Sequence, residues 1–242
     1  MPSVDRVPAT NSLIAGLPRA MRAQVLANCE PVQLEFGTPL GGPEVRIRHV
    51  YFPVDSFISL IAPADGESSL EMGLVGSEGV HGVSLALGVD ASPLNALVQG
   101  SGPALRMSAA AFRREHARNL PFQQHLNRYL YVLMTQLAQS ATCARFHVVE
   151  ARLARWLLMT QDRAHSNCFH ITHMFLAWML GVRRASVSAA ASALQSKRVL
   201  TYKRGDVMVL NRRGLERCAC PCYRIDRNVY RRIMGSSSAP ND

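Results

Sequence analysis

The sequence lacks the features that mark membrane and secreted proteins. No apolar run approaches the roughly 18 residues that a membrane-spanning helix needs. The N-terminal stretch MPSVDRVPATNS has no basic segment followed by an apolar one, which is the layout of a secretory signal. We therefore predict a cytoplasmic protein that binds no membrane.

Recognisable sets of catalytic residues are also missing. The chain contains no serine nucleophile elbow and no phosphate-binding loop. None of its 8 histidines forms an H-x-H pair with a distant carboxylate, as a metalloenzyme built on a β-roll would need. These absences predict that the protein is not an enzyme and holds no cofactor.

The 6 cysteines of this arginine-rich chain do not indicate a secreted disulfide framework. Cys218, Cys220 and Cys222 alternate within one short run, and in an extended strand all three side chains would share one face. Their separation is closer than the two-residue spacing of common zinc knuckles. The simplest interpretation is packing or surface thiols, so we predict no metal; a metal site or a thiol switch is the alternative.

Charge of both signs is present, but it is unevenly distributed. Residues 1–142 contain 10 Lys and Arg against 11 Asp and Glu, whereas residues 143–242 contain 17 against 6. A basic domain attached to a nearly neutral one is typical of proteins that bind the phosphates of nucleic acid. The alternative, a solvated basic surface with no partner, does not account for the segregation.

The clearest pattern in the basic half lies between Ile171 and Leu210. Thr172 is a candidate N-cap for a short apolar helix, and Gly181 interrupts the helical pattern. A second helical pattern follows, and its apolar face consists of Val187, Ala190, Ala191 and Leu194. Two short helices joined by a tight turn predict a helix-turn-helix, whose second helix reads bases in the major groove.

Two β-prone segments follow the second helix. They are residues 199–202 and 207–210, and the sequence Lys-Arg-Gly-Asp between them predicts a hairpin turn. This β-hairpin completes a winged helix-turn-helix. The alternative is a helical hairpin and a β-hairpin with no role in DNA binding, but paired arginines at the start of a helix favour the first interpretation.

Short β-prone segments dominate residues 31–107. They include residues 49–52, 57–62 and 70–75, and turn residues separate them. Several short strands at regular spacing predict a β-sandwich or jelly roll. Helices are predicted on either side, over residues 11–28 and from about residue 109 to residue 161.

One long helix is predicted near residues 119–142, with Pro121 in its first turn. Its apolar residues recur at spacings of three and four, which is a coiled-coil-like pattern. These residues are Phe122, Leu126, Leu130, Leu133 and Leu137. The seam fits pairing with a second copy of the chain, and it also fits packing onto the chain's own β-roll.

Several stretches resemble those of Crp/Fnr-type bacterial transcription regulators. The family's C-terminal DNA-binding domain is similar to FLAWMLGVRRASVSAAASALQSKRVLTYKRG. The sensor domain of a divergent branch is similar to VGSEGVHGVSLALG, HVYFPVDSFISL and ALVQGSGPALRM. The resemblance extends from about residue 11 to residue 232. It implies a cyclic-nucleotide-binding-like β-roll, a long helix that forms the dimer interface, and a winged helix-turn-helix.

Arg184 is the predicted base-reading residue. An arginine at the start of a recognition helix can fork onto O6 and N7 of guanine, and alignment on Gly181 matches Arg184 to the family's base-reading arginine. The family's next two reading positions correspond to Ala185 and Ala189, so its usual recognition sequence is not implied. The predicted contacts to bases and phosphates are Arg183, Arg184, Ser186, Ser188, Ser192, Thr172, His173, Lys197, Arg198, Lys203 and Arg204.

The family's effector-binding residues are absent from the matching positions. Cyclic-nucleotide-binding members have a Gly-Glu pair followed by Arg-Ser, whereas this chain has Gly82-Val83 and then Leu94-Asn95. Burying a phosphate without a cation is costly, so we predict no cAMP binding in the family's usual mode. The first hundred residues contain only Cys29, which argues against the iron–sulfur cluster of Fnr-type oxygen sensors.

The predicted fold class is α+β. The predicted segments are a disordered N-terminus (1–10), a cyclic-nucleotide-binding-like β-roll or jelly roll (11–118), a dimerisation helix (119–142), a winged helix-turn-helix (143–219) and a Cys-containing basic extension (220–242). We predict a homodimeric regulator that binds a pseudo-palindromic site in double-stranded DNA, responds to an unknown signal at the β-roll, and contacts RNA polymerase if it activates transcription. The alternatives are a regulator without ligand sensing and a signalling module whose basic domain docks a protein.

Overall fold

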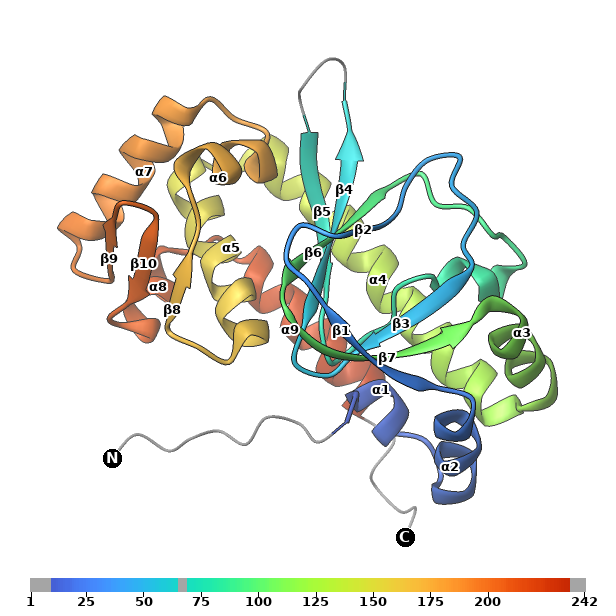
Figure 1. Cartoon of the computed structure of the whole chain (residues 1–242). Coiled ribbons are helices and arrows are strands. Elements are labelled where there is room, and N and C mark those ends of the chain that lie inside the picture. The colour runs from blue at the N-terminus through green and yellow to red at the C-terminus, as the bar shows by residue number, and fades with distance from the viewer. Residues whose placement is uncertain (1–9, 65–68, 236–242) are drawn as a thin grey trace, which may run out of the picture. The chain divides into compact units, whose positions relative to one another are not determined.

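The structure is a computed structural model that describes residues 10–64 and 69–235 (Figure 1). Of the N-terminal segment predicted to be disordered, all but Thr10 lies outside the described residues. The chain divides into two compact units. The first comprises Met1–Leu60, Leu74–Thr135 and Asn228–Asp242, and the second comprises Ile61–Gly73 and Gln136–Arg227. Within the described residues, no helix has the length and apolar character to cross a membrane.

Short strands form two sheets in the N-terminal half. The first has the order β1-β7-β3 and is antiparallel, and the second has the order β2-β6-β4-β5. The strands are β1 (Glu30–Leu34), β2 (Pro39–Gly41), β3 (His49–Pro53), β4 (Phe57–Pro63), β5 (Ser69–Val75), β6 (Asn95–Gly100) and β7 (Gly102–Ser108). The predicted roll of short strands is confirmed.

Helices flank this roll as predicted. They are α1 (Ser12–Ala15), α2 (Arg19–Ala27), η1 (Val83–Leu87), α3 (Ala109–Arg118) and α4 (Leu120–Phe146). The buried side chain of Asn11 caps α1 and donates hydrogen bonds to the carbonyl oxygens of Pro53 and Gly79, at 2.9 and 2.8 Å. One polar residue therefore connects the first helix to the end of β3 and to the loop that contains Gly79.

The first half of α4 packs into the core of its own chain. Phe122 and Leu126 are 0% exposed and belong to one apolar cluster with Leu13, Phe52 and Phe112. Leu130 and Leu133 pack against the same cluster and are half-buried, as is Leu137. The roll of their own chain therefore covers Phe122 and Leu126, which leaves no exposed surface of these two side chains for the predicted dimer interface.

The second unit contains the remaining helices and a small sheet. Its elements are the last part of α4, α5 (Val149–Ala164), β8 (Cys168–His170), α6 (His173–Leu180), α7 (Arg184–Ser196), β9 (Leu200–Lys203), β10 (Asp206–Val209), α8 (Arg212–Cys218) and the start of α9 (Cys222–Met234). The sheet has the order β8-β10-β9 and is antiparallel. The predicted β-hairpin thus gains a third strand, which the sequence pattern did not reveal.

The predicted basic extension over residues 220–242 contains a helix. The last turns of α9 belong to the first unit, where Met234 is buried in the apolar cluster that contains Phe122. Tyr230 in the same turns donates a hydrogen bond to the carbonyl oxygen of Glu78 at 3.2 Å. The chain after the wing is thus part of the packed structure as far as Gly235.

Burial of His81 predicts a pH dependence of stability. Burial lowers the pKa of this imidazole from 6.5 to about 4, so the unfolded chain binds a proton between these values that the folded chain does not bind. Above pH 6.5 His81 is neutral in both states, and the contribution of the buried neutral imidazole to the free energy of unfolding is fully present. This contribution is lost as the pH falls from 6.5 toward 4. The loss should reach about 3 kcal/mol of unfolding free energy.

Urea unfolding followed by circular dichroism at about pH 7 and about pH 4.5 measures this difference. The His81→Gln variant should show a smaller decline than the wild type over the same range. An equal decline in both proteins would refute the assignment to His81.

Candidate nucleic-acid interface

The helix-turn-helix forms from the local signals that the sequence contains. The hydroxyl of Thr172 caps α6 by accepting a hydrogen bond from the backbone N–H of Phe175, at 3.1 Å. Gly181 ends α6 in the left-handed conformation, with φ of 60°, which favours glycine. After a short turn, α7 begins at Arg184. The predicted helix, turn and helix are confirmed.

Packing determines which face of α7 is available. The predicted apolar face is buried, and α7 packs on α5 and α6. Arg183, Arg184, Ala185, Ala189 and Ser192 are exposed. In the part of the chain that the structure describes, the guanidinium groups of Arg183 and Arg184 make no hydrogen bond or ion pair. Both cations are therefore free to bind an anion.

Two predicted contact residues are occupied by bonds inside the motif. The hydroxyl of Ser188 lies 2.9 Å from Nδ1 of His173 and also donates to the carbonyl oxygen of Arg184 at 3.2 Å. Burial and then the charge of Arg184 lower the pKa of His173, which favours its neutral form. The His173 ring packs edge-on against Tyr202, with centroids 4.4 Å apart. His173 and Ser188 thus connect α6, α7 and the wing.

The remaining predicted residues differ in their surroundings. Ser186 is half-buried in the first turn of α7. Lys197, just after α7, is exposed and forms an ion pair with Glu150. Arg198 is exposed with φ of 54°. Arg198 is therefore better placed than Lys197 to meet a phosphate, because no carboxylate neutralises it within the described residues.

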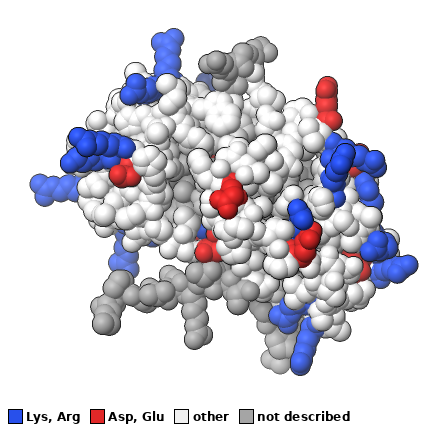
Figure 2. Space-filling model, in the orientation of Figure 1, with Lys and Arg blue, Asp and Glu red and all other residues white. Residues whose placement is uncertain are grey.

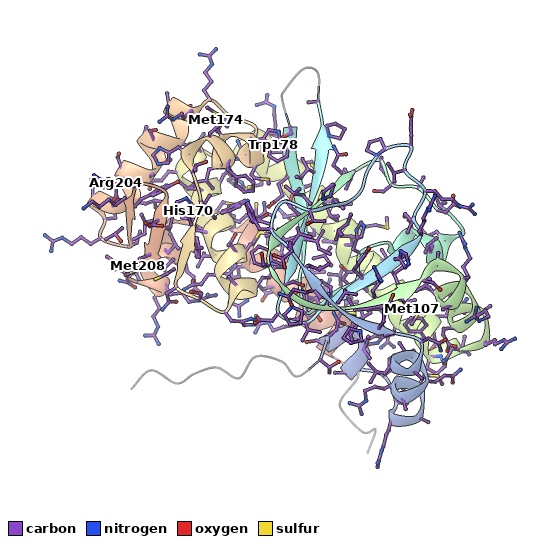
Figure 3. All side chains as sticks on the ribbon, viewed as in Figure 1. Met107, His170, Met174, Trp178, Arg204 and Met208 are labelled. Atoms are coloured by element: carbon purple, nitrogen blue, oxygen red, sulfur yellow. The ribbon has the colours of Figure 1, made fainter. Side chains whose placement is uncertain are left out.

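The wing is the hairpin of β9 and β10, and a tight turn joins these two strands. Arg204 and Gly205 both have positive φ, 54° and 93°, as a type I′ turn requires. Lys203 and Arg204 are exposed on this turn. Figure 3 shows Arg204 there, with His170 and Met208 on the neighbouring strands. Nδ1 of His170 on β8 lies 2.8 Å from Oδ1 of Asp206 on the neighbouring strand β10.

Lys and Arg side chains gather at the edge formed by α7 and the β9–β10 turn, as Figure 2 shows on the left of the view. Arg184 contributes the positive charge of the recognition helix, and Lys203 and Arg204 contribute that of the wing. Phosphate contacts from such residues position a protein on DNA, and contacts to base edges provide sequence specificity. The geometry therefore fits double-stranded DNA.

The three cysteines of the CxCxC run lie on two helices and a turn, and not on the extended strand that the sequence analysis considered. Cys218 ends α8, Cys220 lies in the turn, and Cys222 begins α9. The sulfur atoms of Cys143 and Cys220 are 3.4 Å apart. This hydrogen bond lowers the pKa of Cys143 to about 5 and raises that of Cys220. Cys143 was not among the predicted residues, because it lies on the distant helix α4.

The comparisons with known proteins agree with this geometry. Residues 151–218 match the model of the Crp-like helix-turn-helix domain. A comparison with curated proteins found no match. Solved structures of similar fold match most of the chain, and their identities of 14–18% establish likeness of fold alone.

Three of these structures illustrate the likeness. A Eubacterium rectale protein assigned to the crp/fnr family of transcriptional regulators has a TM-score of 0.67 and 14% identity, over 85% of this chain and 96% of its own. FixK2 from Bradyrhizobium japonicum has a TM-score of 0.66 and 14% identity, over 79% and 98%. The c-di-GMP responsive global regulator CLP from Xanthomonas campestris has a TM-score of 0.65 and 16% identity, over 79% and 99%.

The fold and the interface define a DNA-binding transcription regulator. Residues 151–218 are a Crp-like helix-turn-helix domain, and the fold of the chain is similar to that of a solved structure assigned to the crp/fnr family.

Proposed function

We propose that this protein reads a specific DNA sequence and acts as a homodimer. The position of Arg184 supports base reading most directly. Its guanidinium has no hydrogen-bond or ion-pair partner among the described residues and is exposed in the first turn of α7, and the opposite face of that helix is buried. N-terminal residues of a recognition helix contact base edges in the major groove. Arg184 would then donate two hydrogen bonds to a guanine.

The other exposed cations would bind phosphates. Arg183 and Arg198 lie at the two ends of α7, and Lys203 and Arg204 lie on the wing. Such contacts release counterions from DNA, so binding should weaken steeply as the salt concentration rises. Two copies related by a twofold axis would place two α7 helices about 34 Å apart in successive major grooves. If the bound protein activates transcription, RNA polymerase is the expected further partner.

The Arg184→Ala variant tests base reading. Operator selection from random duplexes at two salt concentrations should yield a palindromic motif with the wild type. The variant should lose the base preference at one position in each half-site. It should also bind the selected site roughly 10- to 100-fold more weakly, because a bidentate contact contributes about 1–3 kcal/mol.

Arg114→Ala is the matched control for that experiment, because Arg114 is exposed on α3, in the unit that does not contain the motif. It should select the same motif as the wild type. Equally sharp motifs from Arg184→Ala and the wild type would refute base reading by Arg184. Tight, salt-sensitive binding without a motif would indicate a non-specific binder, and no DNA binding would favour a basic domain that docks a protein.

The exposed face of α4 supports a dimer interface that differs from the predicted seam. Exposed residues recur there at alternating spacings of four and three, the pattern of a coiled-coil seam. They are Asn127, Tyr131, Met134, Ala138, Ala141 and Arg145. Tyr131 is 51% and Met134 is 66% exposed in the single chain. Pairing of two α4 helices would bury both side chains.

The Met134→Glu variant tests this interface. A glutamate near the twofold axis would bring a second copy of its own charge into an apolar contact, so the dimer should dissociate at least about tenfold more readily. The monomer should keep its fold, because Met134 makes little contact with its own chain. Sedimentation equilibrium and circular dichroism measure the two effects.

Leu87→Glu is the control, since Leu87 is 65% exposed and lies outside α4. It should leave the dimer intact. A Met134→Glu dimer as stable as that of the wild type would contradict the proposed face, and a monomeric wild type would contradict the dimer itself.

We also propose that the roll does not bind cAMP in the family's usual mode. Gly82 precedes η1 in a left-handed conformation, and the next positions of interest, Val83 and Leu85, are buried in the apolar core. Leu94 packs against a second apolar cluster. None of these side chains can pair with a phosphate. A signal at the roll, if one acts, would therefore use other residues.

Thermal unfolding with added cyclic nucleotides tests this proposal. A ligand that binds only the folded protein raises the midpoint of unfolding, by an amount that grows with its concentration. Cyclic AMP and cyclic GMP should leave the midpoint unchanged. A rise with either nucleotide would contradict the proposal. Adding c-di-GMP would examine the ligand named for the similar structure CLP.

A further inference from the structure

Four potential metal ligands converge in the second unit. They are Cys143, His147, Cys220 and Cys222, and their ligand atoms all lie within 4.8 Å of one another. The sulfur atoms of Cys143 and Cys220 are 3.4 Å apart, and the sulfur of Cys222 is 3.4 Å from Nδ1 of His147. Two chain segments that lie 77 positions apart in sequence thus bring a Cys₃His set together.

Local structure holds the ligands in two pairs. Cys143 lies in the last turn of α4, and His147 follows directly after the end of that helix, four residues further on. Their backbones are joined by a hydrogen bond of 3.2 Å. Cys220 and Cys222 flank Pro221 in the turn where α9 begins. The backbone N–H of Cys220 donates to the carbonyl oxygen of Ala151 at 3.4 Å.

The dimensions of the cluster suit a tetrahedral zinc ion. A Zn–S bond of about 2.3 Å places two sulfur ligands of a tetrahedron about 3.8 Å apart. The sulfur atoms of Cys143 and Cys220, which are 3.4 Å apart, need only a small expansion to reach this value. Three thiolates and one imidazole are also a common ligand set of structural zinc sites.

The burial of the cluster argues against surface thiols. Cys143, Cys220 and Cys222 are 2%, 5% and 0% exposed, and they form a cluster of their own, with Ala151 as the apolar neighbour packed against it. Thiols that only fill space usually join a larger apolar core. Here three sulfur atoms face one another and an imidazole, which is the arrangement that a shared ion requires.

Polar groups around the cluster fit negatively charged sulfur. The side-chain amide of Gln139 donates to the sulfur of Cys222 at 3.0 Å. Arg155 is buried, and its positive charge acts on Cys143 and Cys220. Its Nε–H is buried and makes no hydrogen bond with any described residue. A zinc ion with three thiolates bears one net negative charge. Arg155 is also paired with Asp226, and Arg152 supplies a second positive charge that acts on Cys143 and Cys220 and favours the negatively charged site.

We propose that Cys143, His147, Cys220 and Cys222 bind a structural Zn²⁺ ion. Binding would form three Zn–S bonds and one Zn–N bond, and the thiol protons would pass to solvent without any change of oxidation state. Four protein ligands leave no open coordination position, which is typical of structural and not catalytic zinc. The ion would join the end of α4 to the start of α9. The proposal does not depend on DNA binding.

Metal content measured on the full-length protein tests the site. Protein purified under reducing conditions and dialysed against a weak chelator should retain one zinc ion per chain. Cys222→Ser and His147→Ala should each reduce zinc affinity by more than the about 10–100-fold that loss of an outer-shell partner causes. Cys218→Ser is the matched control, because Cys218 belongs to the same run but not to the cluster. It should retain zinc.

Cobalt substitution and chelation give readouts that do not depend on the variants. Co²⁺ added to the metal-free wild type should produce a thiolate-to-cobalt charge-transfer band and the visible bands of a tetrahedral ion. A strong chelator should lower the melting temperature of the wild type and of Cys218→Ser, but should not lower that of Cys222→Ser any further. If the ligand variants fail to fold, the metal content and cobalt spectrum of the wild type decide the question.

Three results would overturn the proposal. The first is wild-type protein that retains no zinc and gives no cobalt spectrum. The second is zinc that survives Cys222→Ser but is lost in Cys218→Ser. The third is a disulfide between Cys143 and Cys220, found by mass spectrometry in the protein as purified under reducing conditions, because those two sulfurs could not then bind the ion.

Discussion

The burial of one face of α7 is the constraint on which the DNA-reading geometry depends. Val187, Ala190, Ala191 and Leu194 are removed from solvent against α5 and α6. Burial of a valine or leucine side chain contributes about 1.5–3 kcal/mol, which outweighs any single surface contact of the helix. Because one face is held in this way, Arg184 must project from the other. The recognition surface is thus a consequence of packing.

Polar side chains inside the second unit have a comparable role. Nη2 of Arg155 on α5 donates hydrogen bonds to Oδ2 of Asp226 on α9, at 2.8 Å, and to Oγ of Ser140 on α4, at 3.1 Å. All three side chains are largely removed from water. A buried charge is costly unless it is paired and hydrogen-bonded, so these contacts restrict how the three helices can pack. The cysteine cluster lies among the same helices, and a bound ion would strengthen the same connection.

Local signals made the helix-turn-helix and the wing predictable. Thr172 caps the start of α6, Gly181 ends the same helix, and Gly205 permits the tight turn of the wing. Each of these residues acts within a few positions of its own place in the chain. The spacing of apolar residues on α4 was equally visible, but spacing identifies a face and not the surface that covers it. Phe122 and Leu126 proved to face the roll, while Met134 remained exposed. The third strand of the wing was not predicted, because Cys168–His170 is too short to show a pattern, and the helix α9 was not predicted either.

Helix caps, turns and apolar periodicity are short-range properties, so the class of fold and the DNA-binding motif could be predicted from the sequence alone, and Arg184 was predicted to read bases. Tertiary packing brings Cys143 and His147 to Cys220 and Cys222, and it leaves Cys218 outside this cluster. It also decided which face of α4 is free and which hydroxyl groups, such as that of Ser188, are already bonded. These contacts join residues far apart in the chain, and no local pattern encodes how distant segments pack against each other.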